Sequence, residues 1–333
     1  MIGVSCIFEG QYQLRRLTFH RLGRTRGYWC SNGKRAKVTF EILNIIAPVF
    51  VVVGIGFFLE YRGIGFHTET LSRLAMMIGT PCLVFSSLTG TTLPDDALFR
   101  IAVIALSAAV VGGALSAILL LLVRLPLRTF ISSLSLPNAG NAGLPLVFFA
   151  FAEPGLTIGA AFFFVIAFVQ YTVVPAVVSG NPGLRNLLRE PLIWAVIAVI
   201  FLRVVELPTP KVVAVSTALL GGITIPLMLI LLGGALARLK VSDVKTSVLL
   251  ALMRLAVGVT TGLALVWLFQ LEGVEAGAIF LLCSMPSALI TYVIAQHYGR
   301  SPERVAGFVV SSTVLNFACL PFLISAALYL AAL

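Results

Sequence analysis

Two asparagines, Asn138 and Asn141, lie in an apolar stretch that also carries helix breakers. The stretch reads Leu136-Pro137-Asn138-Ala139-Gly140-Asn141-Ala142-Gly143-Leu144-Pro145-Leu146. Its prolines and glycines interrupt the helix, and lipid cannot satisfy the N–H and C=O groups that are freed. Asn138 and Asn141 are three residues apart, so on a helical part their amides share a face and could hold a carboxylate. We expect Asn138, Gly140, Asn141, Gly143 and Pro145 to form half of a substrate site.

A second stretch, Cys283-Ser284-Met285-Pro286-Ser287-Ala288, offers the same kind of chemistry. Ser284, Pro286 and Ser287 are therefore expected to supply the other half of the site. Two further amides, Gln170 and Asn316, each precede a proline by five residues and complete the predicted set. The alternative is that these polar groups only satisfy the broken backbone or let helices pack closely.

The composition is that of an integral membrane protein. The 333 residues are 59% hydrophobic and 11% charged, with a mean hydropathy of +1.05, whereas soluble domains carry roughly a quarter charged residues. The apolar runs are long and do not alternate with polar residues, which excludes an outer-membrane barrel. We predict an all-α polytopic membrane protein in the cell membrane. The net charge of +10 follows from membrane topology and does not indicate nucleic acid.

Ten apolar stretches are near the ~20 residues needed to cross a bilayer. They cover residues 41–59, 69–90, 97–123, 131–152, 156–178, 191–206, 212–237, 246–270, 274–297 and 305–330. Loops on one side of these stretches hold eleven Lys or Arg residues, against three on the other side. The excess places the first set in the cytoplasm and both ends of the ten-helix core outside.

Residues 1–37 form a basic extension that differs from the rest of the chain. They hold eight of the 23 basic residues and one acid, Glu9. The extension could lie on anionic lipid, or it could reflect a translation start placed too far upstream. The predicted membrane core follows, as residues 38–180 and 181–333.

Prolines recur in the two halves of the core. Pro81, Pro145 and Pro175 correspond in order to Pro226, Pro286 and Pro321. With five segments in each half, the halves must sit upside down relative to each other. This inverted repeat is typical of secondary transporters, whose sites lie where interrupted segments meet.

The stretch from Asn138 to Leu146 resembles the fourth-helix motif of the auxin efflux carrier family, which includes bacterial malonate or malate permeases and plant auxin carriers. Met285-Pro286-Ser287-Ala288 and Ser311-Ser312-Thr313 resemble the second-half pattern of the same family. The resemblance covers about residues 40–331. It implies a five-plus-five inverted repeat in which broken helices four and nine cross near the midplane.

The interior of most predicted segments holds no carboxylate in its central turns, although coupled carriers usually keep an ionisable residue there. The sequence therefore assigns neither H⁺ nor Na⁺ as coupling ion, and sodium on unwound carbonyls stays an alternative. No cofactor or metal site is expected. Arg254 is the one charge well inside a segment, and we expect it to snorkel toward the cytoplasmic face. A role opposite an anion is the alternative.

These patterns predict a secondary membrane transporter for a small organic anion such as a mono- or dicarboxylate. A sodium-coupled organic-anion symporter of the same architecture is the alternative, and a channel is a third. An enzyme is not expected, because the interior offers no nucleophile–base pair. The expected partners are the anion and the lipid bilayer, with a homodimer left open.

Overall fold

The computed structural model describes residues 32–64, 68–91, 93–179, 190–238 and 241–333. Contacts divide the chain into a short unit, Met1–Glu41, and a large unit, Ile42–Leu333. Most of the predicted basic extension, residues 1–31, lies outside the described residues, and so do residues 180–189, which follow the fifth apolar stretch. All of the predicted site residues belong to the large unit.

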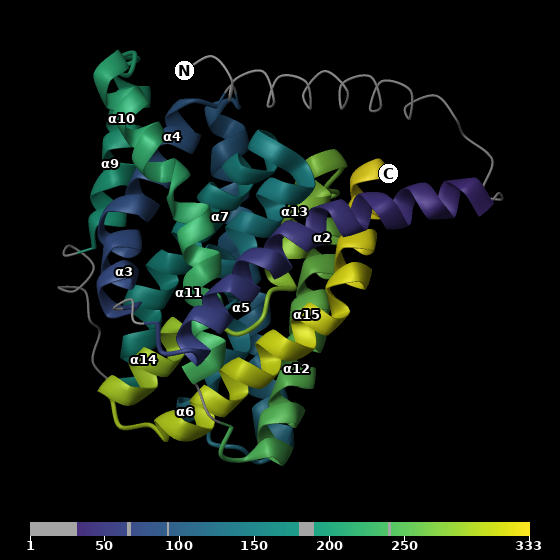
Figure 1. The fold of residues 1–333 in the computed structure, drawn as a ribbon. Helices are drawn as coiled ribbons and strands as arrows, with labels where there is room; N and C mark the ends of the chain where they lie inside the picture. The colour runs from purple at the N-terminus through teal and green to yellow at the C-terminus, as the bar shows by residue number, and fades with distance from the viewer. Residues whose placement is uncertain (1–31, 65–67, 92, 180–189, 239–240) are drawn as a thin grey trace. The chain divides into compact units, whose positions relative to one another are not determined.

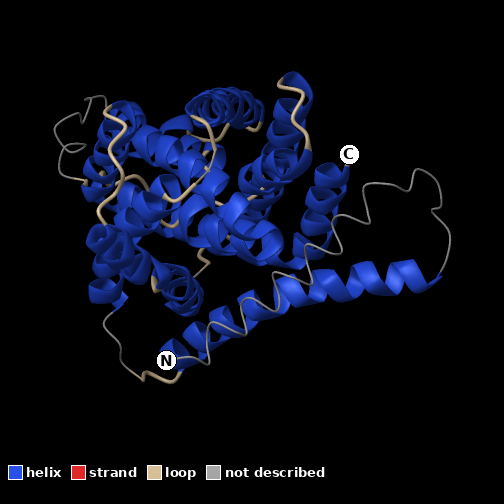
Figure 2. Ribbon diagram, turned by 90° about the horizontal axis from the view of Figure 1, so that it is seen from above, coloured by secondary structure: helices blue, strands red, loops and turns tan. Residues whose placement is uncertain are grey.

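The described part of the chain contains helices and loops but no strand (Figures 1 and 2). The first half contains α2 (Asn32–Tyr61), α3 (Thr68–Leu74), the π-helical η1 (Ala75–Gly79), α4 (Thr80–Thr89), α5 (Asp95–Leu122), α6 (Leu127–Ser135), the π-helical η2 (Ala139–Gly143) and α7 (Leu144–Ser179). The second half contains α9 (Pro191–Val204), α10 (Lys211–Gly222), α11 (Thr224–Arg238), α12 (Val244–Leu268), α13 (Gly273–Cys283), α14 (Ile290–His297) and α15 (Pro302–Ala332).

Six helical stretches among the described residues are long and apolar enough to cross a membrane. They are Thr70–Thr89, Asp95–Leu122, Ala139–Val178, Lys211–Arg238, Val244–Leu268 and Pro302–Ala332. Shorter apolar helices cover Ile45–Tyr61, Pro191–Val204 and Gly273–Cys283. The predicted class, an all-α membrane protein with several spans, is therefore confirmed.

Most of the interior prolines mark interruptions. A π-helical turn, η1, precedes Pro81, and the helix break between α10 and α11 lies at Ile223, three residues before Pro226. α7 passes through a non-helical residue, Ala152, with φ 55° and ψ −145°. This kink falls where the fourth expected stretch ends. In contrast, α15 continues through Pro321.

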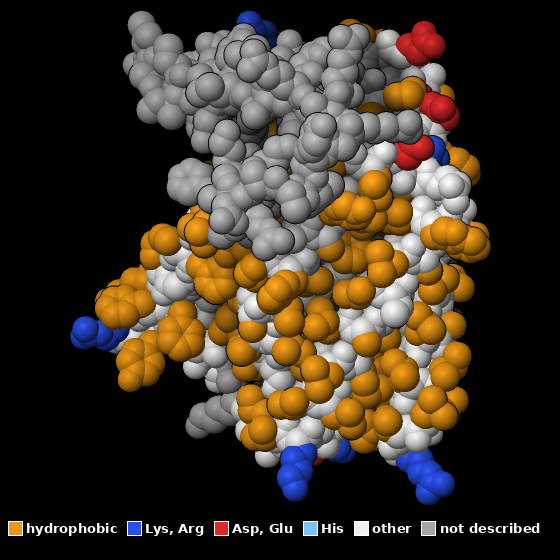
Figure 3. Space-filling model, turned by 90° about the vertical axis from the view of Figure 1, so that its right-hand side faces the viewer, with side chains coloured by type: hydrophobic (Ala, Val, Ile, Leu, Met, Phe, Trp, Pro, Cys, Tyr) orange, Lys and Arg blue, Asp and Glu red, His pale blue; other side chains and the backbone are white. Residues whose placement is uncertain are grey.

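One face of the molecule shows how the surface suits a bilayer (Figure 3). Apolar side chains cover most of that face, Lys and Arg side chains project from its lower border, and Asp and Glu lie near its upper border. Largely exposed apolar residues such as Val212, Trp267 and Phe322 would be costly in water and are favourable in lipid.

The helices that carry the predicted site pack together in the interior. α12 lies against α5, α13 and α15, and α7 lies against α5 and α13 (Figure 1). Large side chains such as Phe162, Phe280 and Phe308 are completely buried there. This packing brings the interrupted segment α6–η2–α7 next to the interrupted segment α13–α14.

Candidate functional site

The two interrupted segments pair with each other through their backbones. The N–H of Asn138 donates to the carbonyl oxygen of Pro286 at 2.8 Å, and Pro137 and Ser287 form an isolated antiparallel bridge. Both Pro137 and Pro286 sit next to a broken helix end that needs partners away from water. Each break therefore provides hydrogen-bond partners for some of the backbone groups that the other break leaves unpaired.

Asn138 organises the turn that leads from α6 into η2. Its side-chain Oδ1 accepts a hydrogen bond from the N–H of Asn141 at 3.2 Å, and its backbone oxygen accepts from Gly143 at 2.9 Å. The side chain is 4% exposed. Its Nδ2, a donor, finds no partner in the part of the chain that the structure describes. Asn141 itself is half-buried.

The second break has its own donors. Ser284 Oγ donates back to the carbonyl of Phe280 at 2.8 Å. This hydroxyl is therefore already paired with the preceding helical turn. The N–H of Ser287 donates to Ser312 Oγ at 3.2 Å. The hydroxyl of Ser287 is fully buried and has no partner among residues 32–333 as far as these are described.

The amides at matching places in α7 and α15 behave differently. Asn316 Nδ2 donates to the carbonyl of Ser284 at 2.7 Å, so this side chain fixes the second break to α15. Gln170 is 6% exposed, and within the described residues its Nε2 has no acceptor. Asn316 therefore binds helices together, whereas Gln170 has an unused donor.

The two glycines of the motif lie where neighbouring side chains leave little room for a Cβ. A Cβ on Gly140 would lie 2.8 Å from Phe163 Cε2, and one on Gly143 would lie 2.9 Å from Leu282 Cδ2. Pro145 stands in the first turn of α7, directly after the π-helical η2. The two glycines therefore allow Phe163 and Leu282 to approach the backbone closely, and the role of all three residues in substrate binding stays a prediction.

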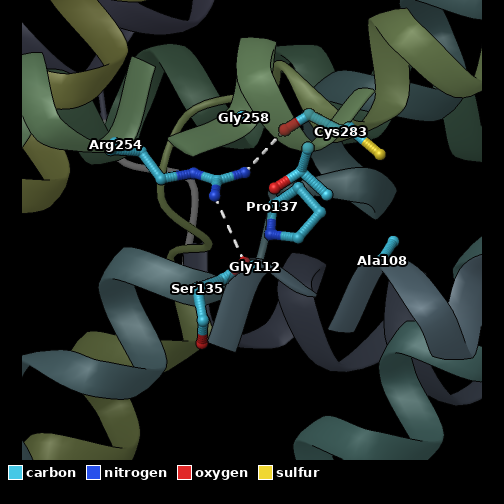
Figure 4. Close-up of a pocket in the computed structure, with 8 residues that line it drawn as sticks. Ala108, Gly112, Ser135, Pro137, Arg254, Gly258 and Cys283 are labelled. Atoms are coloured by element: carbon cyan, nitrogen blue, oxygen red, sulfur yellow. Dashed lines mark hydrogen bonds between the residues drawn. The ribbon is translucent and has the colours of Figure 1, made fainter. Parts of the chain in front are cut away.

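Arg254 does not snorkel, contrary to the expectation from its place in the sequence. It is 2% exposed. Its guanidinium donates to the carbonyl oxygens of Met285 (3.1 Å), Leu134 (3.0 Å), Ser135 (3.2 Å) and Cys283 (2.8 Å). Two of these bonds, to Ser135 and Cys283, are drawn in Figure 4. The side chain turns inward because both broken segments present unpaired carbonyls to α12.

The charge of Arg254 is balanced by backbone dipoles. All four acceptors are main-chain oxygens at or just beyond the carboxyl ends of α6 and α13. Each helix carboxyl end carries roughly half a negative charge, so two of them together match one guanidinium. Four of its five N–H groups are used in this way.

A small cavity opens beside the guanidinium, with room for about one water molecule. It is lined by Ala108, Gly112, Ser135, Pro137, Arg254, Gly258, Thr261 and Cys283 (Figure 4). Thr261 is 3% exposed, and its buried hydroxyl lacks a hydrogen-bond partner in the described segments. The cavity thus adds a hydroxyl and a guanidinium to the polar groups of the two breaks.

Comparison with known proteins finds similarity to membrane transport proteins. Residues 175–324 match the model of a family described as membrane transport protein. The chain is also 25% identical over 292 residues, 83% of this chain and 95% of the other, to an uncharacterized transporter of Methanothermobacter thermautotrophicus. This chain resembles membrane transport proteins. The matched region contains α12, α13 and most of α15, and therefore Arg254 and the second break.

In this transporter-like chain, the sequence pointed to most of the polar residues at the two breaks, but it expected Arg254 to turn toward the cytoplasmic face and did not single out Thr261. Both lie on α12, seven residues apart, which is two helical turns and hence one face. The available signal in the sequence for a polar site was a guanidinium and a hydroxyl on the same face of an apolar segment. They could not be assigned without knowing which neighbours α12 has.

Proposed function

We propose that this protein is a secondary carrier that moves a small organic anion across the cell membrane by alternating access. One observation carries the proposal. Asn138 Nδ2 and Ser287 Oγ are buried without partners, as far as the structure describes the chain, on the two breaks that pair at Pro137 and Ser287. Buried polar groups in native proteins nearly always have partners, so two unused donors at one junction suit a ligand that accepts hydrogen bonds.

The electrostatics favour an anion. A carboxylate can accept from several amide and hydroxyl donors at once. The two breaks also begin new helices, α7 and α14, whose amino ends carry partial positive charge. No acidic side chain lines the small cavity beside Arg254 within the described residues. The surroundings therefore suit negative charge better than positive.

We further propose the arrangement expected from the proline repeat. The core would have ten membrane segments in two inverted halves, residues 38–180 and 181–333, with both ends outside. Segments four and nine would be the broken pair, crossing where Asn138 donates to Pro286. In such carriers the ligand lies between the repeats and one half rocks against the other.

A ligand screen followed by a flux assay tests the proposal. Purified protein is melted in the presence of mono- and dicarboxylates, since a ligand of the folded state raises the melting temperature by mass action. An anion that stabilises the protein is then loaded into proteoliposomes. A carrier shows saturable uptake and counterflow of the labelled anion. Stabilisation by no anion, or a flux that does not saturate, would contradict an anion carrier.

A further inference from the structure

Four backbone carbonyl oxygens form a cage around the guanidinium of Arg254. Leu134 and Ser135 contribute from the end of α6, and Cys283 and Met285 from the end of α13, at N···O distances of 2.8–3.2 Å. A cage of this kind, built from unwound backbone and half-helix carboxyl ends, is how membrane carriers with broken helices coordinate Na⁺. Here a side chain of the protein occupies it.

We propose that Arg254 is a built-in monovalent cation that fills this carbonyl cage, so that the wild-type protein binds no sodium ion there. Removing the guanidinium converts the cage into a site for a free monovalent cation, either Na⁺ or guanidinium. The vacated site should thus bind a small monovalent cation, which the carbonyl oxygens would coordinate.

Charge supports this assignment. The carboxyl ends of α6 and α13 each carry roughly half a negative charge, and both point at Arg254. Without a cation between them, these ends repel each other in a medium that screens little. One positive charge at this position therefore stabilises the contact between the two breaks.

The space around the cage supports it as well. α12 comes so close to the second break at Gly258 that a Cβ there would lie 2.5 Å from the carbonyl oxygen of Cys283. This contact, which does not involve the Arg254 side chain, places the carbonyl of Cys283 directly against α12. Thr261 Oγ1, which borders the same cavity and has no partner in the described chain, is one more oxygen for a vacant site.

The consequence for transport rests on the proposed function. If the protein carries an anion past the two breaks, this site contributes no sodium ion to the cycle, and the anion does not draw on the sodium gradient through it. The sequence left open that sodium binds to unwound carbonyls. At this position Arg254 occupies those carbonyls, so sodium does not bind to them here.

Melting of the purified full-length protein tests the proposal without any substrate. Wild type and Arg254→Ala are melted in NaCl, KCl and choline chloride at equal ionic strength, and in choline chloride with millimolar guanidinium chloride. We expect the wild type to melt at the same temperature in all four. Arg254→Ala should melt lower in choline and regain ~2 °C or more with saturating Na⁺ or guanidinium, as binding to the folded state requires.

Arg203→Ala is the matched control. Arg203 also donates to two backbone carbonyls, those of Leu88 and Leu93, but it is only half-buried and pairs with the exposed carboxylate of Asp95. Its removal should lower the melting temperature without making it depend on the cation. Arg254→Lys, which keeps a charge in the cage, should remain insensitive to Na⁺.

The proposal is overturned if wild type and Arg254→Ala respond alike to Na⁺, whether both respond or neither does. If Arg254→Ala does not yield folded protein, Arg254→Gln takes its place, because the amide keeps two donors for the carbonyls while removing the charge. A failed search for a transported anion would count against the proposed function and leave this comparison of cations unaffected.

Discussion

The N–H of Asn138 donates to the carbonyl oxygen of Pro286 at 2.8 Å, which joins two breaks that lie 148 residues apart in the chain. Each break alone would leave backbone groups unpaired in the apolar interior, at a cost of several kcal/mol per group. Together they satisfy one another, and Arg254 satisfies most of what remains. The two breaks are therefore one structural unit, and changes at either should affect both.

Asn138→Asp separates the structural role of this side chain from its role toward a ligand. Aspartate keeps the oxygen that accepts from the N–H of Asn141 but replaces the unused donor with a negative charge. We expect normal expression and a loss of at least tenfold in anion affinity, about 1.4 kcal/mol. The affinity is measured from ligand-dependent melting or from uptake.

Asn138→Ala and Asn141→Ala complete that series. The former loses both the cap and the donor, and should lower stability by about 1 kcal/mol as well as affinity. The latter should reduce affinity without preventing membrane insertion. Unchanged uptake of a verified substrate by Asn138→Asp would show that the junction does not touch the anion.

Gln170→Met and Asn316→Leu should have opposite effects on stability. Asn316→Leu removes a 2.7 Å hydrogen bond to the carbonyl of Ser284 and leaves that buried carbonyl without this partner. The substitution should therefore lower the stability by about 1–3 kcal/mol. Gln170 has no acceptor for Nε2 among the described residues, so an apolar side chain of similar volume should be neutral or stabilising. Thermal melting measures both variants. Strong destabilisation by Gln170→Met would mean that its amide holds the helices together.

Local sequence signals predicted the helices and the breaks, because prolines, glycines and apolar length act within one segment. The interruptions at Pro137–Gly143 and Met285–Leu289 follow directly from those residues. The position of the Arg254 side chain could not be predicted in the same way. From the sequence, a long charged side chain inside an apolar segment favours snorkelling toward the cytoplasmic face. Only the tertiary arrangement shows that four backbone carbonyls surround the guanidinium.

Gly258→Ala should disturb the second break. The added Cβ would lie 2.5 Å from Cys283 O and 3.0 Å from Ser284 Cα, both parts of the backbone that cannot turn away. Overpacking of this kind costs about 1–3 kcal/mol, and melting should show it. Gly113→Ala on α5 is the control, because a Cβ there meets nothing within 4 Å. The control should be neutral or slightly more stable, and equal losses in the two variants would rule out the contact as the cause.

Asp243 gives one element of the fold a dependence on pH. It caps α12, and hydrogen bonds from Thr246 hold the pKa of this carboxyl below its ordinary value. A pKa that is lower in the folded state means stability that is present above the ordinary pKa and lost as the pH falls through the folded one. Melting between pH 3 and about 6 should therefore show a loss at the acid end that is smaller in Asp243→Asn. The same acid loss in both proteins would assign it to other carboxylates.

Thr261→Val tests whether the cavity beside Arg254 is used. The substitution keeps the shape of the side chain and removes a buried hydroxyl that has no partner within the described residues. Because an unpaired buried polar group costs about 1–3 kcal/mol, the variant should be as stable as the wild type or more so, yet it should transport more slowly. Thr260→Val is the adjacent control, since Thr260 Oγ1 already donates to the carbonyl of Ala256 at 2.7 Å and does not line the cavity. Initial rates of uptake in proteoliposomes compare the two. A variant that is more stable and transports at the wild-type rate would show that the Thr261 hydroxyl is a structural flaw and not a functional group.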